Sequence, residues 1–111
     1  KKYGKIKRPL LGIRYITLTP NTKEEFRVPV DYGALITKDN PMAIAIAAGG
    51  PADKAGIKEN DIILEWNGQK ITPEKTIQDF LEDAKVGEMI KAKILRGKTQ
   101  FETLVTLTER R

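Results

Sequence analysis

The chain has 111 residues, of which 40% are hydrophobic, which is enough for one domain with its own core. It contains no histidine and no cysteine, which excludes a Ser-His-Asp triad, His-ligated metals and a disulfide framework, and no cofactor is expected. Twenty Lys and Arg against fifteen Asp and Glu give a net charge of +5, and the excess is concentrated at the two ends.

The basic ends are expected to flank a single folded domain. We expect residues 1–8 to be a basic linker remnant, residues 9–108 to be the domain, and residues 109–111 to be a basic tail. The chain begins at Lys1 without Met, so we expect it to be a segment of a longer protein. Its longest apolar stretch, Met42–Ala48, is far too short to span a bilayer, so no membrane insertion is expected.

The first part of the chain predicts short strands and one short helix. Leu10–Leu18 alternates as a strand does. Thr19-Pro20 predicts the start of a helix, because Thr suits the N-cap and Pro the first helical position. Two further strands are expected at Ala34–Thr37 and at the alanine-rich Met42–Ala47.

The run Gly50–Ile71 predicts four elements in order. Pro51 suits the first turn of a short helix, and Gly56 can take the left-handed conformation that ends it. Asp61–Trp66 is a short apolar run that predicts a buried strand. Asn67-Gly68 supplies the two positive-φ residues of a type I′ hairpin turn.

The last part predicts a helix followed by a hairpin. Apolar residues recur at helical spacing within Thr76–Ala84, and Met89–Leu95 alternates as a strand that pairs with Phe101–Leu107. Together the elements predict an α+β domain: a small, partly open antiparallel β-barrel or sandwich of five to six strands, capped by two main helices. A small α+β domain with no further significance is the plain alternative.

The order of elements in Gly50–Ile71 resembles the centre of a bacterial-type PDZ domain, the peptide-binding module attached to HtrA-like serine proteases. The segments Leu11–Pro20 and Val28–Ile36 resemble the first half of the same domains, so the resemblance covers about residues 8–108. It implies a PDZ fold over residues 9–108 and a periplasmic, extracytoplasmic or membrane-tethered location, which the sequence alone leaves open.

The resemblance implies a carboxylate-binding loop formed by Leu10, Leu11, Gly12 and Ile13. The donors would be the N–H groups of the last three residues, since successive amides can converge on an anion. Gly12 has no side chain, so a ligand can approach the backbone closely.

The resemblance further implies a peptide groove lined by Ile13, Arg14, Tyr15, Thr76, Ile77 and Phe80. An extended peptide would add to the free edge of the strand after the loop. The period of two places Leu11, Ile13 and Tyr15 toward the groove and Arg14 on the other face.

On the helix, the resemblance places Thr76 and Phe80 in the groove and Ile77, Leu81 and Ala84 in the core. The alternative is that Phe80, which belongs to the same apolar stripe, is also only a core residue. Relatives that select a hydroxyl-bearing residue have His where this chain has Thr76, so we expect apolar selection. The large Phe80 is expected to restrict the terminal pocket to small or medium side chains.

The sequence offers no catalytic constellation. Acidic pairs such as Asp61 and Glu65, at the ends of a strand, are expected to be solvated, and no phosphate-binding glycine loop is present. We therefore expect a module that is not an enzyme. It would bind peptides or unfolded proteins with apolar C-termini, and feed or regulate a trypsin-like protease domain in cis.

Two other functions stay open. The domain could serve oligomer assembly or scaffolding, with no attached protease or with its groove filled internally. Alternatively, the basic ends could contact nucleic acid or lipid, although no strand interleaves aromatic and basic residues as an RNA-binding sheet would. A salt titration separates the last case, because electrostatic binding falls steeply with salt.

Overall fold

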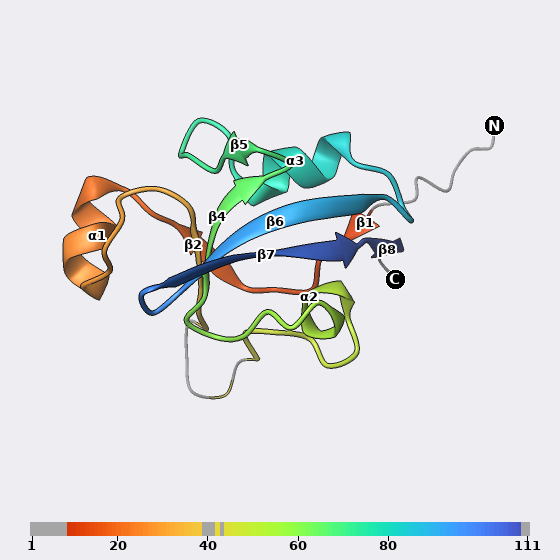
Figure 1. The fold of residues 1–111 in the computed structure, drawn as a ribbon, viewed down its shortest axis with the longest axis horizontal. Helices are drawn as coiled ribbons and strands as arrows, with labels where there is room; N and C mark the ends of the chain where they lie inside the picture. Colours follow the sequence, from red (N-terminus) through yellow and green to blue (C-terminus); the bar gives the residue numbers. More distant parts are fainter. Residues whose placement is uncertain (1–8, 39–41, 43, 110–111) are drawn as a thin grey trace.

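The computed structural model describes residues 9–38, 42 and 44–109. Within this part, the main sheet is open and antiparallel in the order β2-β3-β4-β6-β7, with β5 beside β4. Figure 1 shows helix α1 at one end of the molecule, beyond this sheet. The strands of the sheet are β2 (Tyr15–Thr17), β3 (Ala34–Ile36), β4 (Ile62–Trp66), β5 (Gln69–Lys70), β6 (Met89–Arg96) and β7 (Thr99–Thr106).

Three helices and a second, two-stranded sheet complete the described fold. Strand β1 (Pro9–Leu10) pairs with β8 (Thr108–Glu109). The helices are α1 (Pro20–Phe26), α2 (Pro51–Lys54) and α3 (Ile77–Asp83). The predicted α+β class, with an open antiparallel sheet and covering helices, is confirmed.

The predicted helix starts and turns are confirmed at their signal residues. Thr19 caps α1 by accepting a hydrogen bond from the Thr22 N–H at 3.2 Å. Gly56 follows α2 with a φ of 87°. Asn67 and Gly68 have φ values of 52° and 83°, as the hairpin between β4 and β5 requires.

The two faces of the main sheet carry separate cores. On one face, α2 and α3 contribute Ala52, Ile77 and Phe80 to a cluster that includes Ile63 and Trp66 of β4. On the other face, a smaller cluster is partly covered by the connection between α1 and β3; its buried members are Leu18, Leu35, Ile62, Leu64 and Leu95. Strand β4 is therefore covered on both faces, which explains why all of its residues except Glu65 are apolar and buried.

Two strand predictions need correction. The predicted strand Leu10–Leu18 is divided into β1 and β2, because Gly12 turns the chain with a φ of 78°. The predicted strand Met42–Ala47 is wrong: its described residues form a loop with one isolated bridge, Ile46 to Ile13. Alanine has a low β-propensity, so this segment has little to favour a regular strand. Residues 39–41, between the strands predicted at Ala34–Thr37 and Met42–Ala47, lie outside the described residues.

The expectation that Asp61 is solvated is also wrong. Its side chain is 1% exposed and receives Arg96 Nε on Oδ1 at 2.9 Å and Arg96 Nη2 on Oδ2 at 2.8 Å. The Lys58 N–H donates to the same carboxylate at 2.8 Å, and Arg96 also donates to the carbonyl of Gly56 at 2.8 Å. The hydrogen bond to Asp61 raises the pKa of Arg96, so the guanidinium stays charged.

We predict that this pair, with its buried carboxylate and short hydrogen bonds, contributes more to stability than the half-buried pair of Lys93 and Glu65, whose charged atoms are 3.7 Å apart. Asp61→Asn should lower the free energy of unfolding by about 1–3 kcal/mol, because it weakens hydrogen bonds to a buried carboxylate. Arg96→Met should cost more than Lys93→Met, since it leaves that carboxylate without its cation. Urea melts measure both differences, and equal losses in the two pairs would contradict the account.

Candidate functional site

Strand β2 has one free edge. The Arg14 N–H donates to the Ala45 carbonyl at 2.8 Å, and the Arg14 carbonyl accepts from the Thr37 N–H at 3.1 Å. Main-chain groups of successive strand residues point to opposite edges, so those of Ile13 and Tyr15 point away from β3. No described residue bonds to the main chain of these two residues. The edge is therefore able to accept another extended segment.

In the loop before this edge, two main-chain carbonyls accept hydrogen bonds, whereas three N–H groups donate to no described residue. The Leu11 carbonyl accepts from the Ala52 N–H of α2 at 3.1 Å, and the Gly12 carbonyl accepts from the Ala47 N–H at 2.9 Å. Within the described part of the chain, the N–H groups of Leu11, Gly12 and Ile13 donate to no partner. The positive φ of Gly12 lets neighbouring amides converge, which is the geometry of an anion-binding nest.

The side chains along this segment follow the predicted alternation only in part. Leu11 is 2% exposed and lies in the main core, so it does not face a groove as predicted. Ile13 and Tyr15 are half-buried and pack against the same core, whereas Arg14 is exposed. Leu10 ends β1 and precedes the loop.

On the helix, the Thr76 side chain is the N-cap of α3. Its Oγ1 accepts from the Asp79 N–H at 3.4 Å and lies 3.3 Å from Asp79 Oδ2, to which it donates. The Asp79 carboxylate in turn accepts from the Thr76 N–H at 2.9 Å. This capping box uses the hydroxyl of Thr76 to begin the helix.

The side chains of Ile77 and Phe80 are buried in the core, and their assignment to a peptide groove stays a prediction. Ile77 is fully buried and Phe80 is 6% exposed. The Phe80 ring stacks on Trp66 with a centroid distance of 5.7 Å, and Lys75 Nζ lies 4.9 Å from its centroid. The apolar stripe correctly predicts that Ile77 is core, but the partner of Phe80 depends on tertiary packing.

Sequence reasoning missed a contact across the site. The hydroxyl of Tyr15 accepts a hydrogen bond from the Gln78 N–H at 2.9 Å. This bond ties β2 to the first turn of α3. No local pattern could have predicted it, because the two residues are far apart in the sequence.

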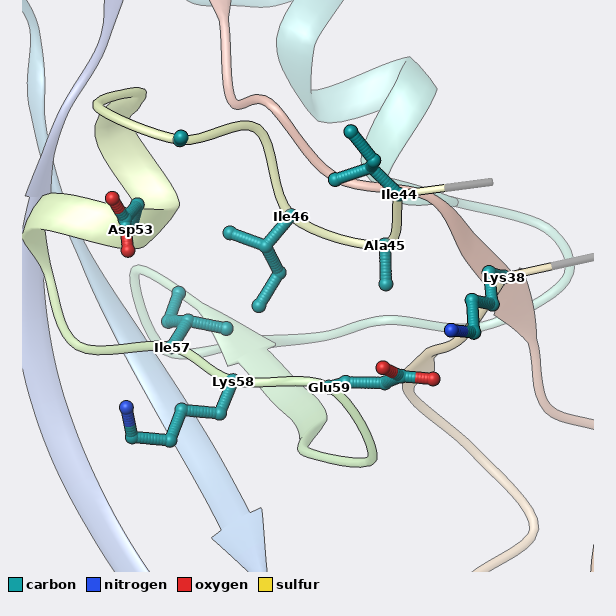
Figure 2. A pocket seen from close by; sticks show the side chains of 9 residues that line it. Lys38, Ile44, Ala45, Ile46, Asp53, Ile57, Lys58 and Glu59 are labelled. Atoms are coloured by element: carbon teal, nitrogen blue, oxygen red, sulfur yellow. The ribbon is translucent and has the colours of Figure 1, made fainter. Parts of the chain in front are cut away.

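The surface has one hollow beside the predicted site residues and another away from them. One of about 640 Å³ lies along β2 toward α1 and is lined by Ile13, Arg14, Tyr15, Ile16, Phe26, Thr37 and Lys38. Another, of about 450 Å³, lies between α2 and the 44–48 loop, where Figure 2 shows Ile46 and Ile57 approaching one another. None of the predicted site residues lines this second hollow.

The described residues contain neither a metal-binding group nor a membrane-spanning helix. No group of three His, Cys, Asp or Glu side chains there is placed to hold a metal ion. No helix in the same ranges has the length and apolar character needed to cross a membrane.

Comparison with known proteins places this geometry in context. The profile of the PDZ domain family matches residues 9–107. The chain is 35% identical over 112 aligned residues to the serine protease Do-like HtrB of Bacillus subtilis, covering 96% of this chain and 24% of that protein. It spans about a fifth to a quarter of the length of the curated relatives it matches.

Solved structures with low sequence identity share the fold. The HtrA-type protease AlgW with a decapeptide superposes with a TM-score of 0.75 at 19% identity, covering 99% of this chain and 32% of that one. The HtrA3 PDZ domain bound to the phage-derived ligand FGRWV gives a TM-score of 0.75 at 20% identity, covering 96% and 92%.

The core position of Phe80 yields a test against a matched residue. Phe80→Ala should lower the free energy of unfolding by about 3–5 kcal/mol, because it opens a cavity beside Trp66. Phe26→Ala should change it far less, since that ring is 41% exposed at the end of α1. Trp66 is the sole tryptophan of the chain, so its fluorescence should respond to the first substitution and not the second. Equal destabilisation would contradict this assignment.

Proposed function

Because the chain belongs to the PDZ domain family, we propose that it binds peptides or unfolded proteins by a free, apolar C-terminus at the open edge of β2. The observation that carries the proposal is the set of three N–H groups, at Leu11, Gly12 and Ile13, that have no partner in the described part of the chain. They adjoin an open strand edge, so one ligand could use both features at once.

In the proposed complex, the terminal carboxylate accepts hydrogen bonds from the loop amides. The peptide runs antiparallel to β2, with its last residue opposite Ile13, and exchanges main-chain hydrogen bonds with the open edge. These bonds are independent of the peptide's sequence. Specificity among peptides therefore depends on the peptide side chains that face the protein, at every second position.

An apolar terminal residue suits the surroundings of the loop. Ile13 is half-buried and packs against the main core beside the proposed carboxylate site. The hydroxyl of Thr76 is engaged in capping α3, and the chain has no histidine that could recognise a hydroxyl-bearing ligand. Burial of a peptide side chain at Ile13 would supply hydrophobic stabilisation without a polar requirement.

In a longer protein, we place this domain beside a trypsin-like serine endopeptidase, with residues 1–8 as the linker. The predicted tail at 109–111 begins too early, because Glu109 of β8 pairs with Pro9. Relatives such as HtrB of Bacillus subtilis are serine proteases of which this chain matches only a minor part. The domain would present substrate C-termini to the protease or report their presence to it. Catalysis would then reside outside this chain.

The carboxylate contact predicts a difference between two forms of one peptide. A free-acid peptide ending in an apolar residue should bind more tightly than its C-terminal amide by about 1.5–3 kcal/mol, the range for hydrogen bonds to a charged group. Calorimetry with both forms measures this difference. Equal affinities would contradict the proposed role of the loop.

A salt series on the free-acid peptide tests the alternative that binding occurs through the basic ends. Affinity should change little with salt if the peptide adds to β2, whereas a steep loss would indicate binding through the basic ends.

The same account predicts that the chain alone cleaves no peptide bond. It has no histidine or cysteine to serve as general base or nucleophile. During incubation with fluorescently labelled casein over hours, fluorescence should be released no faster than in buffer without the protein. Turnover that copurifies with the folded domain, and resists inhibitors of contaminating proteases, would contradict it.

A further inference from the structure

Tyr15 occupies an unusual place in the proposed site. It lies in β2, its ring is half-buried against the main core, and its hydroxyl reaches the Gln78 N–H at 2.9 Å. Gln78 is the second residue of α3, so the side chain spans from the open strand edge to the first turn of the helix. The tyrosine thus lies across the space between strand and helix.

The hydrogen bond from the Gln78 N–H to the Tyr15 hydroxyl also helps to cap α3. The first N–H groups of a helix have no partner within it and must be satisfied from outside. At α3, the Thr76 hydroxyl accepts from the Asp79 N–H, and the Tyr15 hydroxyl accepts from the Gln78 N–H. Tyr15 therefore completes the cap of α3 and is held in place by the bond that it accepts.

The register of strand addition determines which peptide residue meets this ring. With the last residue opposite Ile13, the preceding residue lies opposite Arg14, and the one before that lies opposite Tyr15. Residues directly opposite each other on paired strands have Cβ atoms about 4.5–5.5 Å apart on the same face. The peptide side chain two positions before the C-terminus is therefore directed at the Tyr15 ring.

The Tyr15 side chain lies between that peptide side chain and the first turn of α3. Ile77 and Phe80 are committed to the core, and Phe80 is held against Trp66. The hollow along β2 extends toward Phe26 of α1 and is lined by no residue of α3.

Resting on the proposed function, we propose that Tyr15 sets the class of ligand: peptides with a small residue, Gly, Ala or Ser, two positions before an apolar C-terminus. A long or aromatic side chain at that position would have to displace the ring and break its bond to Gln78. The last residue of the peptide remains under the control of the loop and Ile13.

The test uses free-acid peptides that end in Val and differ only two positions before the end, with Gly, Ala, Leu or Phe there. Wild type should prefer Gly and Ala over Leu and Phe by about tenfold or more, the cost of forcing a bulky group into a filled space. Tyr15→Val should reduce this preference to within about threefold. Tyr32→Val, which removes a half-buried ring on the opposite face of the sheet, should leave it unchanged.

A second measurement keeps the test decisive if Tyr15→Val unfolds. Tyr15→Phe retains the ring but not the acceptor, so it should keep the preference while the Gln78 amide exchanges its hydrogen faster than in wild type. Wild-type binding with no preference between Gly and Phe, or a preference that survives in folded Tyr15→Val, would overturn this proposal alone. Failure of all the peptides to bind wild type would overturn the proposed function and this proposal with it.

Discussion

The buried carboxylate of Asp61 fixes the connection on which the rest of the site depends. It accepts from Arg96 of β6 and from the Lys58 N–H, and Arg96 also bonds to the carbonyl of Gly56 at the end of α2. One ion pair therefore joins a strand of the sheet to the segment that leads from α2 into β4. Because the Ala52 N–H of α2 donates to the Leu11 carbonyl, the position of α2 is passed on to the candidate carboxylate loop.

The opposite wall of the site is held by apolar packing. Ile77 and Phe80 fasten α3 to the main core, and the ring stack with Trp66 sets where the helix lies relative to β4. We infer that recognition instead falls on main-chain groups and on Ile13 and Tyr15, which leaves a site with strong backbone requirements and few side-chain determinants.

Most of the fold could be predicted from the sequence because its signals are local. Thr19, Gly56 and Asn67 each act through the conformation of their own turn, and alternation along β6 and β7 reports which face is buried. The strand predicted at Met42–Ala47 was wrong because the alanines of this segment fit a loop as readily as a strand.

The site could be predicted less well, because its decisive contacts are long-range. Whether Asp61 is solvated depends on Arg96, and whether Phe80 faces a ligand depends on Trp66; neither pairing leaves a local pattern. The position of the loop was easier to predict, since Gly12 turns the chain there with a positive φ, and its role in binding a carboxylate stays a prediction. The bond between Tyr15 and Gln78 could emerge only once strand and helix were placed side by side.

The central claim is that a peptide's carboxylate and main chain meet this domain at the loop and open edge of β2. The most direct measurement is an amide NMR titration of the folded chain with a free-acid peptide that has an apolar C-terminus. The account predicts that the largest shifts occur at the amides of Leu11, Gly12, Ile13 and Tyr15, with smaller ones in the first turn of α3. Shifts centred instead on β6 and β7, at the opposite end of the sheet from β2, with the loop amides unmoved, would contradict it.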